Sequence, residues 1–263
     1  MDAFLSANHQ RFRYRDEGTG EPILLLHGVG GRLEVWDGIV AELQDTWRLI
    51  RFDQRGHGES AKPKGPYTLD DFVADAEGVA DALGLQRFHL AGFSLGGLVA
   101  QGFALAHQKR LISLALLSTV AGRTAEEQAR VMQRLALVAE GIPGAHFKQS
   151  MLRWFTEDFV ARNPALIEAY AARNAQNDPD AYAAAYRVLA ESDLADSLPA
   201  IALPSLVMTG EEDQGSNPRM ARLMHERLAG SELHLLPGLR HSILIEAPRQ
   251  VAGILRAFFS KHH

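Results

Sequence analysis

The sequence predicts an α/β fold with a mostly parallel sheet, helices on both faces and a helical insertion in the second half of the chain. Three observations predict it. Short apolar runs alternate with segments of helical spacing along most of the 263 residues. The run at 22–26 is continuously apolar, as in a strand covered on both faces. A Gly-x-Ser-x-Gly turn at 92–96 separates a strand from a helix.

The individual elements follow from local pattern. The expected strands are 10–15, which alternates polar and aromatic residues, the continuously apolar 22–26, and 47–53, 87–91, 111–117, 204–208 and 232–236. The expected helices are 68–83, 98–106, 126–140, 181–190, one that begins at 217–218, and 250–259. Thr68 is an expected N-cap and Gly84 an expected stop for the first of these helices. Asn217 caps another, with Pro218 in its first turn.

The stretch 122–196 interrupts the alternation of strands and helices. It is rich in alanine, contains several helical segments and has no convincing strand. We expect a core formed by 1–121 and 197–263, with 122–196 inserted as a helical lid. Ligands in open α/β sheets bind beyond the carboxyl ends of the strands, so an insertion after a strand end would roof that crevice. The alternative is a set of extra core helices that touch no site.

Composition excludes several function classes. Lys and Arg number 27 against 32 Asp and Glu, a net charge of −5, so no basic surface for nucleic acid is expected. The chain has no cysteine, which excludes disulfides, thiol catalysis and cysteine-ligated metal. No apolar stretch is long enough for a membrane span, and the first residues do not resemble a signal peptide. A cytoplasmic location and no membrane partner are therefore expected.

Ser94 lies at the centre of Gly92-Phe93-Ser94-Leu95-Gly96. In such a turn the strand ends and a helix starts at once, which exposes the serine hydroxyl at the apex. Side chains at the two flanking positions would collide with neighbouring backbone, so glycine is needed there. The pattern predicts a nucleophilic serine. The alternative is a glycine-rich turn that contains a serine by chance, and the strand and helix around it argue against this.

A serine nucleophile needs a base to take its proton and an acid to orient that base. In such folds these groups follow strand ends in the chain order serine, acid, histidine. His241 follows the last predicted strand and is the expected base. Asp213 follows the preceding strand and is the expected acid, because Asn217 already caps the next helix. Glu211 and Glu212 are alternatives for the acid, and all these charges could also be solvated surface groups.

Backbone donors for an oxyanion are expected from two turns. The glycine-rich segment 27–31 follows a strand end and can aim the Val29 N–H at the oxyanion. The Leu95 N–H is the second expected donor, because Leu95 follows the nucleophile at the start of a helix. His27 is expected to support its turn by hydrogen bonding rather than to act as a base.

Other histidines are expected to be structural. A second dense turn starts at Asp53 and contains His57. His57 could be read as a base, but Asp53 and Arg55 are expected to form a pair that holds the turn. His225 and His234 lie within a predicted helix and a predicted strand. The sequence has no phosphate-binding glycine loop, no His-Glu-x-x-His helix and no dinucleotide fingerprint, so no cofactor and no metal are expected.

These motifs together resemble the α/β-hydrolase family over almost the whole chain, with the lid the least similar part. The motifs are His27-Gly28, the turn 53–60, the turn 92–96, Gly210-x-x-Asp213, and His241 with Glu246-x-Pro248. The part between Trp36 and the helix start at Pro66-Tyr67-Thr68-Leu69 is most similar to 3-oxoadipate enol-lactonases. It is also similar to related small esterases and perhydrolases.

The resemblance implies Ser94 as nucleophile, Asp213 as acid, His241 as base, and Val29 and Leu95 as oxyanion donors. The expected function is a cofactor-free serine hydrolase that cleaves a small carboxylic ester or lactone through an acyl-enzyme. An amide or carbon–carbon bond hydrolase with the same residues, or a ligand sensor of low turnover, are the alternatives. Haloalkane dehalogenases and epoxide hydrolases are disfavoured, because they have aspartate where this chain has serine. The sequence does not indicate an oligomeric state.

The predicted lid contains groups that could bind a substrate. Its arginines include Arg123, Arg130, Arg134 and Arg153. The enol-lactonase resemblance implies an anionic substrate, and a guanidinium can bind a carboxylate through two hydrogen bonds. Arg123 is the expected contact, since it follows a strand end near the crevice, and Trp154 is expected to wall the acyl pocket. Alternatively, the lid arginines face water and the tryptophan only packs.

Overall fold

The computed structural model describes residues 2–140 and 145–262. Its strands are β1 (Ala3–Ala7), β2 (Gln10–Glu17), β3 (Pro22–Leu26), β4 (Arg48–Phe52), β5 (Phe88–Phe93), β6 (Leu111–Leu117), β7 (Ser205–Gly210) and β8 (Glu232–Leu236). Its helices are α1 (Asp37–Leu43), α2 (Leu69–Ala82), α3 (Leu95–His107), α4 (Ala125–Ala139), α5 (Ala145–Trp154), α6 (Glu157–Arg162), α7 (Pro164–Asn174), α8 (Pro179–Glu191), α9 (Pro218–Arg227), α10 (Ile243–Glu246) and α11 (Pro248–Phe259). The strands predicted at 22–26, 111–117 and 232–236 are confirmed residue for residue.

The strands form one eight-stranded sheet in the order β1-β2-β4-β3-β5-β6-β7-β8. All neighbouring pairs from β4 to β8 are parallel, and β1 and β2 extend one edge as an antiparallel hairpin. The register places Leu26 of β3 opposite Gly92 of β5, and Phe93 opposite Leu117 of β6. The carboxyl ends of the three central strands therefore meet at one edge, as predicted for a mostly parallel sheet.

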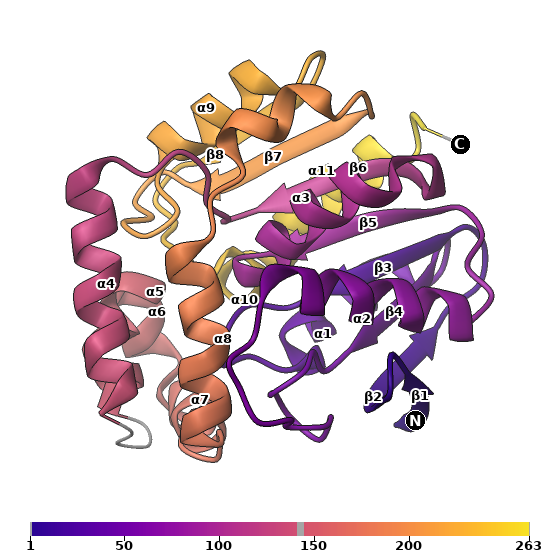
Figure 1. Cartoon of the computed structure of the whole chain (residues 1–263). Coiled ribbons are helices and arrows are strands. Elements are labelled where there is room, and N and C mark those ends of the chain that lie inside the picture. The colour runs from indigo at the N-terminus through magenta and orange to yellow at the C-terminus, as the bar shows by residue number, and fades with distance from the viewer. Residues whose placement is uncertain (1, 141–144, 263) are drawn as a thin grey trace.

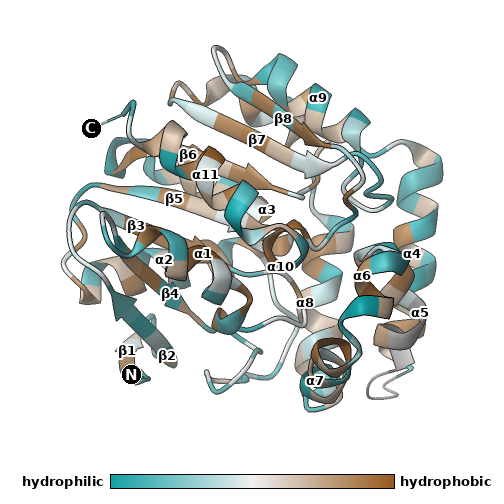
Figure 2. Ribbon diagram, turned by 180° about the vertical axis from the view of Figure 1, so that it is seen from behind, coloured by the Kyte–Doolittle hydropathy of each residue, from teal (hydrophilic) through white to brown (hydrophobic). Residues whose placement is uncertain are grey.

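Helices cover both faces of the sheet, and each face has its own apolar core. On one face α2, α3 and α9 contribute buried residues such as Phe72, Phe103 and Met224. On the other face α1 and α11 pack against each other, with buried side chains that include Leu43 and Leu255. Figure 2 shows apolar residues concentrated on the central strands, whereas β2 is more hydrophilic. Strands between two helical layers need apolar side chains on both sides, which explains their continuous apolar runs.

Helices α4–α8 lie between β6 and β7 in the chain, within the stretch predicted to be a helical insertion. Figure 1 shows them gathered at one end of the molecule, and the arrowheads of β6 and β7 point toward them. The helices α4 and α8 pack side by side through Val131 and Leu135 against Tyr182 and Tyr186. These helices therefore stand over the carboxyl edge of the sheet. Among the residues described, no helix is both long and apolar enough to cross a membrane.

The predicted helix caps are present. The Thr68 hydroxyl accepts the Asp71 N–H, and the Asp71 carboxylate in turn accepts the Thr68 N–H, which closes a capping box at the start of α2. The Asn217 side chain accepts the Met220 N–H at the start of α9. Gly84 follows α2 with φ of +70°, a conformation that favours glycine. The side chains of Thr68 and Asn217 thus satisfy backbone donors that the first turn of each helix leaves free.

The predicted pair between Asp53 and Arg55 is wrong. Asp53 is fully buried and accepts the Leu33 N–H at 2.8 Å, and its other oxygen accepts a hydrogen bond from Arg13 at 3.2 Å. Arg55 instead donates two hydrogen bonds, of 2.6 and 2.8 Å, to the buried carboxylate of Asp75 in α2. Both residues hold the turn, but each does so with a partner that is distant in the sequence.

Candidate active site

Ser94 occupies the sharp turn between β5 and α3 with φ of +55°, in the left-handed region. A Cβ atom added to Gly92 would overlap the carbonyl oxygen of Gly96, and one added to Gly96 would overlap that of Leu26. The predicted need for glycine on both sides of the serine is therefore confirmed. The Ser94 N–H donates to Leu117 O at 2.9 Å, which ties the strained turn to the end of β6. The sheet thus holds the hydroxyl at its carboxyl edge.

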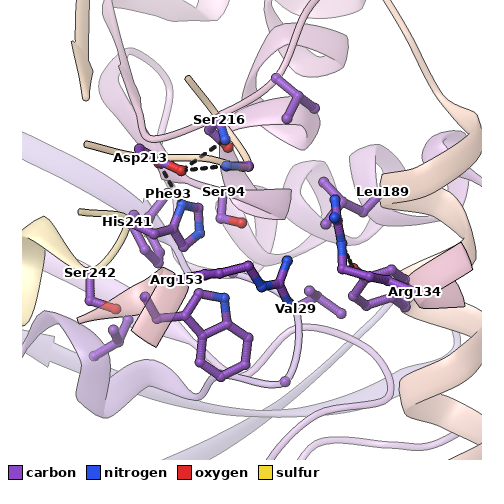
Figure 3. Close-up of a pocket in the computed structure, with 18 of the residues that line it drawn as sticks. Val29, Phe93, Ser94, Arg134, Arg153, Leu189, Asp213, Ser216, His241 and Ser242 are labelled. Carbon is purple, nitrogen blue, oxygen red and sulfur yellow. Dashed lines mark hydrogen bonds and ion pairs between the residues drawn. The ribbon is translucent and has the colours of Figure 1, made fainter. Parts of the chain in front are cut away.

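Asp213 and His241 meet next to this serine. The loop after β7 places Asp213, and the loop after β8 places His241, whose Nδ1 lies 2.7 Å from Asp213 Oδ2. The other carboxylate oxygen of Asp213 accepts the N–H groups of Gly215 and Ser216 at 2.8 and 2.9 Å. Figure 3 shows Ser94 and His241 facing the same pocket, with Asp213 behind the imidazole. The chain order serine, acid, histidine matches the predicted order.

The environment keeps Asp213 ionised although it is buried. Burial alone would raise its pKa, but the facing His241 and the backbone N–H donors outweigh burial and lower the pKa below the usual range. Glu211 and Glu212 are exposed, and Glu212 lies 3.6 Å from Arg240 rather than near the histidine. Of the three acidic residues that the sequence left open, Asp213 is thus the one in contact with His241.

Two backbone donors flank the serine. A Cβ on Gly28 would approach the Cβ of Ser94 to 2.9 Å, so the turn after β3 passes directly beside the candidate nucleophile. Val29 follows in that turn, and Leu95 opens α3, whose N-cap makes no side-chain hydrogen bond. Within residues 2–140 and 145–262 no hydrogen bond occupies the Val29 or Leu95 N–H. Both N–H groups are thus free of protein partners among the described residues, and their role as oxyanion donors stays a prediction.

Two buried histidines, His27 and His57, hold the turn after β3 in place. His27 Nδ1 lies 2.7 Å from Gly28 O, and its Nε2 accepts the Gln54 N–H at 3.0 Å. His57 packs against it with ring centroids 5.0 Å apart, and its Nδ1 lies 2.8 Å from Arg55 O. Burial lowers the pKa of His27 to about 4. Burial, together with His27, lowers the pKa of His57 to about 3. Both rings are neutral supports, as predicted for His27.

These two histidines give a pH dependence of stability with a definite sign. Each pKa is far below the ordinary value of 6.5, so the unfolded chain binds protons first as the pH falls. The free energy of unfolding should be at its plateau above pH 6.5 and should decrease from there toward pH 4, by about 1.4 kcal/mol per pH unit for each histidine. Urea unfolding at a series of pH values would measure this slope.

The variant His57→Gln serves as the comparison. It should be less stable than the wild type at pH 8, because packing and the bond to Arg55 change, but its stability should depend less steeply on pH between 6.5 and 4. An unchanged slope in this variant would mean that His57 does not titrate on unfolding as the structure implies.

The pocket that contains Ser94 and His241 has a volume of about 160 Å³ and is lined by both the sheet edge and the insertion. The insertion contributes aromatic and aliphatic side chains together with polar and charged ones that include five arginines. The aromatic and aliphatic residues are Val131, Phe147, Trp154, Phe155, Tyr170, Tyr186 and Leu189. Trp154 thus lines the pocket, and its ring packs against Phe147 with centroids 5.6 Å apart. Its expected role as a wall of an acyl site is compatible with this position and stays a prediction.

Arg123 also reaches the pocket wall, but its guanidinium binds the end of α8. It donates to the carbonyl oxygens of Leu189 at 2.7 Å and of Ser192 at 3.3 Å. These carbonyls lie in the last turn of a helix, where a cation is favourable. The arrangement therefore favours a structural role for Arg123 over the expected contact with a substrate carboxylate. Arg153, which the sequence analysis grouped with the other lid arginines, lies closer to the reactive groups (Figure 3).

Residues that sequence reasoning did not single out complete the acid site. The Ser216 and Gly215 N–H groups bind Asp213, and the Thr209 hydroxyl lies 3.3 Å from the same carboxylate. The Gly-Ser pair just after the aspartate was a local signal for such a turn. The described residues contain no cluster of three or more His, Asp or Glu side chains suited to a metal ion.

The chain matches the alpha/beta hydrolase fold family model over residues 21–248, and it belongs to that family. It is 30% identical over 247 residues to 3-oxoadipate enol-lactonase 2 of Acinetobacter baylyi, which is 93% of this chain and 91% of that protein. It is 29% identical to (E)-2-((N-methylformamido)methylene)succinate hydrolase of the same organism, over 96% of this chain and 95% of the relative.

A solved structure shows the same architecture. The enol-lactonase from Burkholderia xenovorans LB400 superimposes with a TM-score of 0.92 and 28% identity, over 98% of this chain and 100% of that chain. The predicted fold and the predicted family resemblance are thus confirmed, and the chain is a hydrolase of this fold.

Proposed function

We propose that this hydrolase cleaves a small carboxylic ester or lactone through an acyl-enzyme, with Ser94 as nucleophile, His241 as base and Asp213 as orienting acid. The observation that carries the proposal is the 2.7 Å contact between Asp213 and His241 beside the strained serine turn. Relatives named as an enol-lactonase and as a succinate-derivative hydrolase are almost equally similar. The overall sequence identity to these relatives therefore does not identify the type of bond that this enzyme cleaves.

The geometry supports the following roles in the proposed reaction. His241 takes the Ser94 proton as the serine oxygen attacks the carbonyl carbon, and Asp213 stabilises the imidazolium that forms. The Val29 and Leu95 N–H groups stabilise the oxyanion of the tetrahedral intermediate. His241 then gives its proton to the departing alcohol, which in a lactone stays attached to the acyl chain. A water activated by His241 attacks the acyl carbonyl and releases the carboxylic acid and Ser94. Every step uses groups of this chain.

Stopped-flow kinetics with a 4-nitrophenyl ester test this proposal. An acyl-enzyme should produce a burst of one nitrophenolate per active site, followed by steady turnover, if deacylation is slower than acylation. The 4-nitroanilide of the same acid should be hydrolysed much more slowly. Faster anilide cleavage would favour the amide alternative, and a burst without turnover would favour a ligand sensor.

A further inference from the structure

A half-buried guanidinium without an anionic partner lies inside the pocket. Arg153, near the end of α5, lines the same cavity as Ser94 and His241, and Figure 3 shows its side chain extending into it toward Val29. In the part of the chain that the structure describes, its hydrogen-bond partner is the Ser150 hydroxyl, and it forms no ion pair with a carboxylate. A guanidinium keeps its charge in proteins, so this position is positive.

The other arginines on this side of the pocket differ from it. Arg123 binds carbonyl groups at the end of α8, and Arg130 is half exposed and paired with Glu126. Arg134 lies 3.3 Å from the Tyr186 hydroxyl and, among the described residues, pairs with no carboxylate. Arg32, which donates to Arg173 O and to Gln176, and Arg173, which stacks over Tyr170, also line the pocket. Among the described residues, the pocket therefore has four arginines without a carboxylate partner, and of these Arg134 acts directly on Arg153.

The two charges affect each other. Burial lowers the pKa of Arg153, and the positive charge of Arg134 lowers it further, whereas Tyr186, Tyr182 and Asp213 act in the opposite direction. Two like charges in a largely apolar cavity repel each other more strongly than they would in water. A bound anion would relieve both the desolvation and the repulsion. The empty pocket is thus electrostatically suited to an anionic ligand.

Hydrogen bonds fix the backbone around Arg153 relative to the loop that carries His241, the candidate base. The Ser242 N–H donates to Trp154 O at 2.8 Å, and the Arg240 guanidinium donates to Leu152 O at 2.5 Å and to Phe155 O at 3.0 Å. These bonds tie the residues on both sides of Arg153 to the loop that carries His241. The Ser150 hydroxyl also accepts a hydrogen bond from the guanidinium of Arg153, which can bind a carboxylate through two parallel hydrogen bonds.

We propose that Arg153, with the charge of Arg134 beside it, binds a carboxylate of the substrate and makes the enzyme selective for anionic esters or lactones. This assignment rests on the proposed function. It replaces Arg123 by a residue whose side chain extends into the pocket that contains Ser94 and His241 (Figure 3). The selected substrates carry one carboxylate in addition to the scissile carbonyl, and the carboxylate is placed by Arg153 while Ser94 attacks.

Matched substrates test the assignment. Mono(4-nitrophenyl) adipate carries a carboxylate, and its methyl ester does not. Wild type should prefer the anionic substrate, and Arg153→Met should lower kcat/KM for it by about 10- to 100-fold, as expected for loss of a charged hydrogen-bonded contact. The methyl ester should change by less than about threefold, which also shows that the variant is folded. Arg153→Lys should retain part of the preference, since it keeps the charge without the planar fork.

Arg130→Met is the control, because Arg130 is at the pocket rim and is already paired. It should leave the ratio of the two kcat/KM values unchanged. The assignment is overturned if the wild type prefers the methyl ester, or if Arg153→Met lowers both rates equally or neither.

A binding measurement separates this inference from the proposed function. Calorimetric titration of adipate into the protein should give a Kd about tenfold weaker for Arg153→Met than for wild type, whether or not esters are hydrolysed. Binding that depends on Arg153 without turnover of either ester would contradict the hydrolytic proposal alone. Hydrolysis of both esters with adipate binding unaffected by Arg153→Met would contradict the anion site alone.

Discussion

Replacing Ser94 with alanine is expected to reduce kcat by about 10⁶, because loss of a triad nucleophile removes the concerted action of the whole triad. The hydroxyl is the group that the strained turn presents beside His241. The alanine side chain fits the same backbone, so the melting temperature should change little. Initial rates with an activated ester, corrected for spontaneous hydrolysis, measure the effect.

Ser242→Ala is the matched control, since Ser242 lines the same pocket and its hydrogen bond to the insertion uses its backbone N–H. This variant should keep its rate within a few-fold of wild type. If Ser94→Ala retained more than about one percent of wild-type activity, the nucleophile would have to be another residue.

Asp213→Asn is expected to lower kcat by about 10⁴, because an aspartate in this position selects the tautomer of the base and stabilises its positive charge. The structure indicates why the amide cannot replace it. Asp213 Oδ1 is bound by two backbone N–H groups and must remain an oxygen, so the amide NH₂ would face His241 Nδ1. The imidazole would then carry its proton on Nε2, where it cannot accept the serine proton. Steady-state rates at pH 8 measure the loss.

Glu211→Gln and Glu212→Gln provide the comparison. Both side chains are exposed and neither contacts the imidazole, so each variant should stay within a few-fold of wild type. If Glu211→Gln or Glu212→Gln lowered kcat more than Asp213→Asn does, that glutamate would be the orienting acid. This result would contradict the assignment of Asp213.

The fold could be predicted because most of its elements are encoded locally. The buried strands β3 and β6 are largely apolar runs, and the caps of α2 and α9 are set by side chains three residues away. The edge strand β1 was not predicted, because its sequence Ala-Phe-Leu-Ser-Ala does not alternate between polar and apolar residues and its structure comes from pairing with β2. The short helix α10 and the helices α5–α7 likewise depend on packing between distant segments.

The candidate site likewise contains some residues that could be predicted from the sequence and others that could not. Ser94, Asp213 and His241 could be proposed from sequence, because each follows a strand end and the chain order is fixed by the parallel sheet. The partner of Arg55 could not, because Asp75 is presented by a helix that starts 14 residues further along the chain. Arg153 could not be separated from the other lid arginines for a similar reason. Its place is determined by contacts between α5 and the His241 loop, 88 residues apart in the case of Arg240 and Leu152.

The central claim is that Ser94 carries the acyl group during turnover. The most direct measurement is mass spectrometry of wild-type protein quenched in acid during steady-state hydrolysis of an activated ester, followed by peptide mapping. We expect one added acyl group, located on the peptide that contains Gly92-Phe93-Ser94-Leu95-Gly96 and assigned to Ser94. An acyl group found on another residue, with continuing turnover in Ser94→Ala, would contradict it.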